Sequence, residues 1–374
     1  MKALISLALI CLLPLSNVAL GQIAKERISP GQRYSFLLYA ENPLNVSRPD
    51  QIIELILKKV RSKFPSFNPK AFFVTYQEKE IPSQLCEEPA GFRHDKEETP
   101  GTIVFVSTFA PFEKKKFQIV WQTDTVIEHQ YPKMTQAALG VKVDYRKIDG
   151  YYTGGKFVDV DSATVPSDHF AHDALYRIEG PGWESDRIVY RYYLDSRNRN
   201  DIFGKRTHDL VLQEIGQNDL VSDSKESYSN MLDWGMDIFK VGESLGIGSI
   251  AMWQDSKVAT VSKVDKVTCR VLNGPIESGV LTEYAGWKVG SGMHDLFSDV
   301  SISAGSRLTK VVASVSGDSV QLCTGLAKHE GCDLIRSENT AEGKWGYTAM
   351  YGKQSLSGDN WELRSFTGEA TSRR

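Results

Sequence analysis

Residues 178–206 read IEGPGWESDRIVYRYYLDSRNRNDIFGKR, and the prediction of the fold starts from them. The triplet Gly180-Pro181-Gly182 is typical of a turn. The segment from Arg187 to Asp195 is rich in Tyr, Val and Ile and predicts a strand. Successive side chains of a strand point to opposite faces. The face that we expect to join the core carries Ile188, Tyr190, Tyr192 and Leu194.

The opposite face of this strand is polar, because it presents Arg187, Val189, Arg191, Tyr193 and Asp195. Charged groups are costly to bury unless they are paired. One interpretation is therefore a solvated sheet face with cross-strand ion pairs. The other is a groove for an anionic ligand, since a guanidinium group donates two parallel hydrogen bonds to a carboxylate or sulfate. Arg197 and Arg199 follow, which places four arginines within thirteen residues.

Short strand patterns continue on both sides of this stretch, whereas long helical periodicity is nearly absent. An antiparallel meander is predicted from residues 34–39, 71–76, 102–109 and 117–122. Lys257–Leu272 and Pro275–Tyr284 predict a hairpin closed by Asn273-Gly274. Residues 209–214 predict a short strand, and residues 51–60 fit a strand edge or a short helix. These patterns predict an all-β fold, at this length a large antiparallel β-sandwich.

The N-terminus predicts export. Met1-Lys2 and the apolar run from Ala3 to Leu15 are typical of a signal peptide, which we place at residues 1–21 with cleavage before Gln22. No Cys follows the cut directly, so no lipobox and no lipid attachment are expected. No later run approaches the roughly twenty apolar residues of a transmembrane helix, so no membrane insertion is expected and the protein is predicted to be exported and periplasmic. We expect residues 22–358 to form a single catalytic β-sandwich domain. Residues 359–374 are expected to be irregular, through a truncation or a change of reading frame.

Composition narrows the class of partner. Hydrophobic residues make up 41% and charged residues 24% of the chain, as in a soluble globular protein. The net charge of −3 gives no reason to expect nucleic acid as a partner. Cys323 and Cys332 are the best candidates for a disulfide. No C-x-x-C or H-E-x-x-H motif is present, so no metal site can be identified from spacing and the cofactor is unknown, with a divalent metal still a candidate.

The segment DHFAHDALYRI, residues 168–178, holds candidate acid–base groups. If it is extended, His172 shares a face with Tyr176, and His169 lies on the other face with Asp173. His172 and Tyr176 would then form an acid–base pair beside the arginine-rich strand. The alternative is that these histidines lie in a loop and carry no chemistry.

Two later stretches also carry candidates. Asp237 and Lys240 flank Ile238-Phe239 and are either catalytic or a simple surface pair. Trp287 and His294 lie in or beside the glycine-rich stretch GWKVGSGMHD, where a Trp could stack on a sugar ring or belong to the core. The glycines between residues 235 and 248 do not match a nucleotide-binding loop.

Several motifs together resemble a known family. They are GPGWESDR at 180–187, YRYYL at 190–194, DIFGK at 201–205, DIFKVG at 237–242, Gly274-Pro275 and WKVG at 287–290. The chain is similar, from about residue 30 to about residue 358, to exported proteins of formerly unknown function (the domain of unknown function 4861 type) from polysaccharide-utilisation clusters of Bacteroidetes. The resemblance implies a galactose-mutarotase-like β-supersandwich. It also implies an activity like that of the ulvan oligosaccharide dehydratase.

Such a dehydratase would remove water from the non-reducing-end uronic acid of a sulfated oligosaccharide and leave a 4,5-unsaturated uronate, the substrate of a downstream unsaturated glucuronyl hydrolase. The developing negative charge must be neutralised, and a base and an acid are needed. We assign Arg187 and Arg191 to the carboxylate or an adjacent sulfate, and His172 to the base. The acid is Tyr193 or Tyr190, of which Tyr193 shares the face of the arginines. The remaining assignments are His294 as reserve base, Lys240 as accessory cation, and Trp183 and Trp287 as sugar-binding surfaces.

Four other functions stay open on the residues alone. A polysaccharide lyase uses the same C5 chemistry but shortens the chain. An epimerase of mutarotase type uses a His/Glu pair and forms no unsaturated product. A non-catalytic carbohydrate-binding protein needs only the groove of Arg and Trp side chains. A glycoside hydrolase needs two carboxylates, for which Glu184, Asp186 and Asp237 are candidates.

Overall fold

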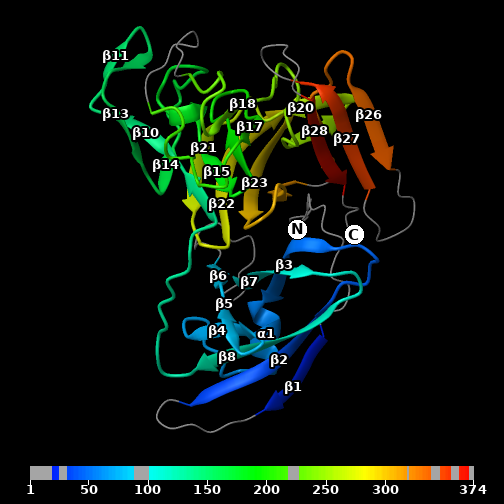
Figure 1. Cartoon of the computed structure of the whole chain (residues 1–374). Coiled ribbons are helices and arrows are strands. Elements are labelled where there is room, and N and C mark those ends of the chain that lie inside the picture. Colours follow the sequence, from blue (N-terminus) through cyan, green and yellow to red (C-terminus); the bar gives the residue numbers. More distant parts are fainter. Residues whose placement is uncertain are drawn as a thin grey trace.

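Antiparallel strands dominate the computed structural model, which describes residues 19–24, 32–87, 101–217, 227–317, 320–337, 346–354 and 362–369. Figure 1 shows an N-terminal part, from β1 to β8, below a larger C-terminal part, from β9 to β28. The predicted leader lies outside the described residues up to residue 18, and β1 (Ala19–Ala24) crosses the expected cleavage point. No helix in the described ranges is long and apolar enough to cross a membrane.

The N-terminal part consists of two sheets, of order β1-β2-β8-β4-β5 and β3-β7-β6. Its elements after β1 are β2 (Arg33–Glu41), β3 (Arg48–Ile56), α1 (Leu57–Lys63), β4 (Phe72–Tyr76), β5 (Lys79–Ile81), β6 (Ser83–Glu87), β7 (Gly101–Phe109) and β8 (Lys114–Gln122). Residues 51–60 therefore form the end of a strand and the start of a helix. The predicted meander is wrong, because β2 pairs with β8 and β3 pairs with β7. This nested pairing buries the apolar faces of both sheets against each other. The ring centres of Phe105 and Phe117 lie 5.0 Å apart in this core.

The C-terminal part is built on two five-stranded antiparallel sheets, of order β18-β17-β16-β15-β9 and β14-β21-β22-β23-β24. The strands of the first sheet are β9 (Thr135–Ala138), β15 (Gly182–Ser185), β16 (Ile188–Tyr192), β17 (Asn200–Lys205) and β18 (Gly235–Asp237). Those of the second are β14 (Ser162–Thr164), β21 (Lys266–Leu272), β22 (Glu277–Val289), β23 (Gly292–Ser303) and β24 (Thr309–Val315). Their facing side chains form the main core, so the predicted all-β sandwich is confirmed.

Smaller sheets and one short 3-10 helix, η1 (Arg177–Glu179), surround this sandwich. Their strands are β10 (Gly140–Val143), β11 (Arg146–Ile148), β12 (Tyr151–Thr153), β13 (Lys156–Asp159), β19 (Ala251–Gln254), β20 (Lys257–Thr260), β25 (Leu322–Cys323), β26 (Asp333–Ser337), β27 (Gly346–Lys353) and β28 (Glu362–Glu369). The N-terminal core uses residues 36–121 and the main core uses residues from 137 onward. Residues 22–358, which were predicted to form a single domain, therefore contain an N-terminal core and a separate main core.

Both faces of β16 are buried, which the alternation alone did not indicate. Tyr190 and Tyr192 join the main core, as expected. On the other face, Val189 packs with Phe203 of β17 and with Leu212 in a separate cluster. The chain from Val211 to Ile215 thus covers the face that carries Arg191. The polar face is neither a solvated surface nor an open groove.

Three local predictions are corrected. Residues 209–214 form turns and not a strand, because the amides of Val211 and Leu212 donate to the buried carboxylate of Glu184 (2.8 Å each) instead of to a neighbouring strand. The expected irregular C-terminus contains β28, which pairs with β27. Cys323 and Cys332 are both free thiols, so the predicted disulfide is wrong.

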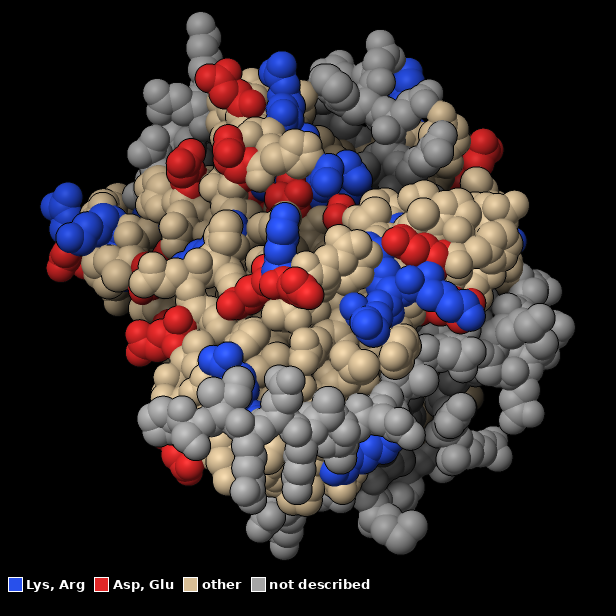
Figure 2. Space-filling view, turned by 60° about the horizontal axis from the view of Figure 1, so that its bottom comes forward, with Lys and Arg blue, Asp and Glu red and all other residues tan. Residues whose placement is uncertain are grey.

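On the face shown in Figure 2, basic and acidic residues lie interspersed.

The hairpin closed by Asn273-Gly274 is confirmed for β21 and β22, but the predicted first strand was too long, because Lys257–Thr260 forms β20 in another sheet. Asn273 in the turn links the two sheets of the sandwich. Its Oδ1 accepts from the Ala137 amide at 2.8 Å, and its Nδ2 donates to the Ala137 carbonyl at 2.9 Å. Asn273→Ala leaves both groups without their partner and should lower the free energy of unfolding by about 1–3 kcal/mol in urea denaturation. Ser291→Ala, in the exposed turn of the next hairpin, is the control and should change it by less than about 0.5 kcal/mol. Equal effects would contradict this role of Asn273.

Candidate active site

Arg191 of β16 is the centre of a buried polar network and is only 4% exposed. The pairing of β16 with β17 sets Arg191 directly opposite Asp201. Two of its nitrogens, Nε and Nη2, donate to Asp201 Oδ2 at 2.9 and 2.5 Å. Its other contacts are Asp237 Oδ2 (2.7 Å), Tyr193 Oη (3.1 Å), Tyr228 Oη (3.2 Å) and Glu179 Oε2 (3.4 Å). The guanidinium is thus fully paired within the protein.

Aromatic rings complete the surroundings of Arg191. Its guanidinium carbon lies 4.9 Å from the ring centres of Tyr193 and Phe203, and 5.4 Å from that of Tyr228. Such contacts stabilise a cation that has lost its water. The Tyr193 hydroxyl donates to Asp201 at 2.5 Å, and burial raises the pKa of Tyr193 far above its ordinary value. Tyr193 therefore holds Asp201 in place and is a poor proton donor to a ligand.

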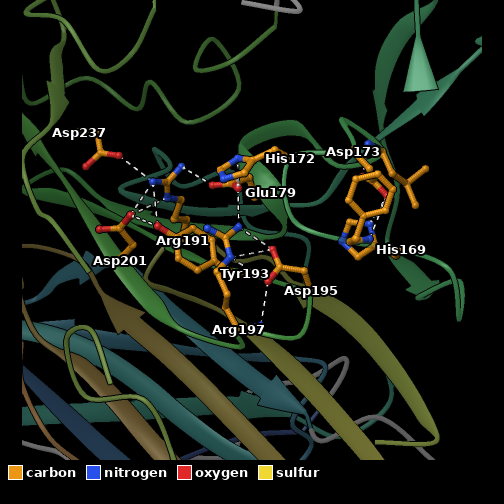
Figure 3. A network of polar contacts seen from close by, with 12 residues as sticks. His169, His172, Asp173, Glu179, Arg191, Tyr193, Asp195, Arg197, Asp201 and Asp237 are labelled. Carbon is orange, nitrogen blue, oxygen red and sulfur yellow. Dashed lines mark hydrogen bonds and ion pairs between the residues drawn. The ribbon is translucent and has the colours of Figure 1, made fainter. Parts of the chain in front are cut away.

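Glu179 links this buried network to the surface. One oxygen, Oε2, faces Arg191, whereas Oε1 lies 2.8 Å from His172 Nδ1 and 2.5 Å from Arg197 Nη2. Figure 3 shows the carboxylate between these three side chains. Burial opposes ionisation, but the hydrogen bond with His172 and the charges of both arginines outweigh it and lower the pKa of Glu179 to about 2. Glu179 is therefore ionised at neutral pH.

His172 and Arg197 are the exposed groups of this arrangement. The His172 side chain is 73% exposed and the Arg197 side chain 30%. Arg197 also pairs with Asp195, with Nη2 2.6 Å from Oδ2, and lies over the ring of Tyr193. Within the described ranges, His172 Nε2 and Arg197 Nη1 make no hydrogen bond. A base or acid nitrogen and a cationic donor are thus available to a ligand, both fixed by Glu179.

The backbone around these groups is unusual. His172, Ile178 and Glu179 have φ of 66°, 54° and 65°. The left-handed region is rare for non-glycine residues and unfavourable for a β-branched residue such as Ile178. Gly180 follows, and a Cβ there would clash with the carbonyl oxygen of Tyr192. The Gly180-Pro181-Gly182 motif therefore lets Glu179 approach β16 closely.

Asp237 differs from Glu179 in its ionisation. Burial and the charge of Asp201 raise the pKa of Asp237 to about 8, although Arg191 opposes the shift. A raised pKa gives a stability contribution that is present below the unfolded value of about 3.9 and is lost as the pH rises through 8. Asn resembles the protonated acid and does not ionise. Asp237→Asn should therefore gain stability relative to the wild type between pH 5 and pH 9.

Urea denaturation of both proteins at the two pH values measures this difference. Asp161→Asn removes an exposed carboxyl and is the matched control, for which the difference should not change with pH. A pH-independent difference for Asp237→Asn would mean that Asp237 is ionised throughout this range.

The network brings together four residues that the sequence singled out, Arg191, Tyr193, His172 and Asp237. Segment 168–178 is not extended, so the predicted pair of His172 and Tyr176 does not form. The ring of Tyr176 instead contacts His169, whose Nδ1 lies 2.7 Å from Asp173 Oδ2. Figure 3 shows this pair of His169 and Asp173 apart from the side chains around Arg191.

Other predicted site residues lie elsewhere. Arg187 does not join Arg191, because the strand begins only at Ile188, and it pairs with Asp186 (3.0 Å) and Asp50 (3.6 Å). His294 lies on β23 and its Nδ1 contacts the Ser316 carbonyl, while Lys240 is exposed beyond β18. The residues that belong to the core and not to a ligand surface are Tyr190, Trp183 and Trp287.

Sequence reasoning missed Glu179, Asp201 and Tyr228. Asp201 carries a detectable signal, since a buried Arg on one strand of a hairpin predicts a carboxylate opposite it on the next. Glu179 and Tyr228 reach Arg191 through turns, for which no periodicity exists. Of the carboxylates considered for hydrolysis, Glu184 is held by Lys205 and two amides, and Asp186 accepts from Gly305 at 2.7 Å. Across the described ranges, no group of three or more His, Cys, Asp or Glu could hold a metal ion.

A protein-family model matches most of the chain. The family model described as "Domain of unknown function (DUF4861)" matches residues 40–365. No curated protein and no solved structure is significantly similar to the chain.

Proposed function

The chain belongs to the DUF4861 family, and from its site we propose that it is a carbon–oxygen lyase that dehydrates the non-reducing-end uronic acid of ulvan-type sulfated oligosaccharides. The observation that carries this proposal is the arrangement of His172 and Arg197 on a single oxygen of Glu179. It offers a proton-transfer group and a cationic donor side by side, as the elimination requires. Arg197 thereby replaces Arg187 and Arg191 as the residue that binds the uronate carboxylate.

The steps follow from these positions. Arg197 Nη1 binds the carboxylate and stabilises the charge that develops on it. His172 Nε2, in its neutral form, takes the proton from C5, and the electron pair of the C5–H bond forms the C4–C5 double bond as the C4–O bond breaks. The same imidazole then gives its proton to the departing hydroxide, which leaves as water. Glu179 positions the imidazole through Nδ1 and touches no reacting atom.

Absorbance and mass spectrometry test the proposal. Purified protein is mixed with uronate-terminated ulvan oligosaccharides, ultraviolet absorbance is followed, and product masses are measured. Rising absorbance with loss of one water and no shortening supports a dehydratase, whereas shorter products would indicate a polysaccharide lyase. An unchanged absorbance from folded protein would exclude both eliminations and favour a carbohydrate-binding protein or an epimerase.

An epimerase of mutarotase type is the second candidate, because the 2.8 Å contact between His172 and Glu179 supplies the His/Glu pair that it would use. It would change the anomeric ratio of a sugar, detected by polarimetry, with no unsaturated product. For the dehydratase we further propose export to the periplasm, where the unsaturated uronate would pass to an unsaturated glucuronyl hydrolase.

Replacing Glu179 should change the pH dependence. The hydrogen bond with Glu179 raises the pKa of His172, so activity that needs the neutral imidazole rises with pH through a value above the ordinary 6.5. Glu179→Gln removes the negative charge and should move this acidic limb of kcat/KM to lower pH. Glu243→Gln removes an exposed carboxylate outside the cluster and should leave the limb in place. An unmoved limb in Glu179→Gln would exclude His172 as the titrating base.

A further inference from the structure

A cavity of about 190 Å³ lies where the two parts of the chain meet. One wall is formed by residues 49–52 and Glu54, near the start of β3, and the other by β22, β23 and residues 305–308 and 310. In Figure 1, β3 and β6 lie at the top of the N-terminal part, towards the lower end of β22. A cavity of this volume holds several waters and is large enough to admit one monosaccharide ring. None of His172, Glu179 and Arg197, which together are called the His172 cluster, lines this cavity.

Polar side chains line the sheet side of the cavity because of strand register. Glu277 lies opposite Ser303, and Ser301 lies opposite Lys310. Ser301 and Ser303 are two apart on β23 and so share one face, while Ile302 between them points into the main core. The hydroxyl of Ser303 makes no hydrogen bond within the described ranges. This end of the sheet therefore presents hydroxyl groups where an apolar face would be expected.

Two cations line the cavity, Lys310 and Arg307, and they differ in their partners. Lys310 Nζ lies 2.6 Å from Glu54, an ion pair that joins the two walls. Asp50 faces Arg187 at 3.6 Å. Burial raises the pKa of Glu277 above its ordinary value, although Lys310 opposes the shift. Arg307 is exposed and makes no ion pair to any described residue, so its charge is available to an anionic group.

The wall that carries Arg307 is fixed by β15 and β16. Tyr190 Oη donates to the Arg307 carbonyl at 2.7 Å, and Ser185 Oγ donates to the Ser306 carbonyl at 2.5 Å. The Gly305 amide donates to Asp186 Oδ1 at 2.7 Å. A site held in this way loses little freedom on binding, which favours affinity.

We propose that this cavity binds one sugar unit that carries a single carboxylate or sulfate. The anionic substituent pairs with Arg307, and the ring hydroxyls contact Ser301, Ser303 and the carboxylate of Asp50. The proposal does not rest on the activity proposed for the His172 cluster. It also gives a role to Arg187, which lies apart from Arg191 and pairs with Asp50 at the edge of the cavity.

Calorimetric titration of the full chain tests this site. The probes are sodium glucuronate and glucose 6-sulfate, with glucose and sodium sulfate as the sugar and the anion alone. Arg307→Gln should weaken binding of at least one charged sugar at least about tenfold, since a hydrogen bond to a charged group is lost. Ser303→Val is the second variant and should also weaken it. Arg146→Gln, an exposed Arg on β11, and His172→Ala should leave it unchanged.

Each outcome of these titrations either supports the proposed sugar site or overturns it. Binding that is lost in Arg307→Gln and kept in His172→Ala supports it and identifies the preferred anionic group. No heat with either charged sugar, or a number of bound sugars and an affinity that stay at wild-type values in both cavity variants, would overturn it. Equal binding of sodium sulfate alone would also overturn it, because the cavity would then be an anion site without sugar recognition. Loss of binding in His172→Ala alone would assign the sugar to the His172 cluster instead.

Discussion

Arg191→Met is expected to lower the free energy of unfolding by about 3–5 kcal/mol. The substitution keeps an unbranched side chain of similar length but removes the cation. Asp201 and Asp237 are 0% and 1% exposed, and each would lose its contact with Arg191 without gaining water. Asp201 would then be a buried carboxylate without a counter-ion, and Asp237, whose raised pKa of about 8 keeps it mostly protonated at pH 7, would lose a hydrogen-bond partner. Urea denaturation at pH 7 measures the change.

Arg187→Met is the matched control for this experiment. Arg187 lies four residues earlier, is about one-third exposed and pairs with Asp186 and Asp50 near the surface. Its replacement should lower the free energy of unfolding by no more than about 1 kcal/mol. Similar losses in the two variants would show that burial of Arg191 does not set its contribution. A triple variant with Asn at positions 201 and 237 should recover part of the loss, since no buried carboxylate remains there unpaired.

His172→Ala is expected to lower kcat/KM by about 100- to 10,000-fold if the protein is the proposed dehydratase. The imidazole would be both the base at C5 and the acid for the leaving hydroxide, so no second group replaces it. Its side chain is 73% exposed, and stability should change little. Activity is followed by the absorbance of the unsaturated product, and folding by thermal denaturation.

His208→Ala provides the comparison for His172. His208 is also exposed (68%) and also lies near a carboxylate, Asp186 at 3.6 Å, but outside the network. It should retain wild-type activity. Undiminished turnover in His172→Ala would remove this residue from the mechanism, and a shared loss in both variants would point to a general effect on the protein.

The fold could be predicted largely because strand signals are local. Alternation identified β2, β4, β7, β8 and β16, and Asn273-Gly274 identified the hairpin of β21 and β22. The pairing of β2 with β8 could not be predicted, because it depends on which apolar faces meet and not on neighbours in sequence. The strand predicted at 209–214 failed since Glu184, distant in sequence, takes its amides.

The site was predictable where it lies on strands and unpredictable where it lies on turns. Arg191 and Tyr193 were assigned to one face, and they do meet, at 3.1 Å. The burial of that face depends on Leu212 and Ile215, whose position no periodicity reports. His172 was singled out for its neighbours in an extended segment, but a left-handed backbone turns it towards Glu179. Its proposed role survives with a different partner.

The Arg191 network also constrains how the chain can fold. Its members come from four segments, around residues 179, 191–201, 228 and 237, which must all dock before every charge has a partner. A chain in which only some of these segments have docked would hold a guanidinium or a carboxylate away from water without its counterpart. Such partly assembled states are therefore unstable relative to both the folded and the unfolded chain. We therefore expect the segments of the network to dock together.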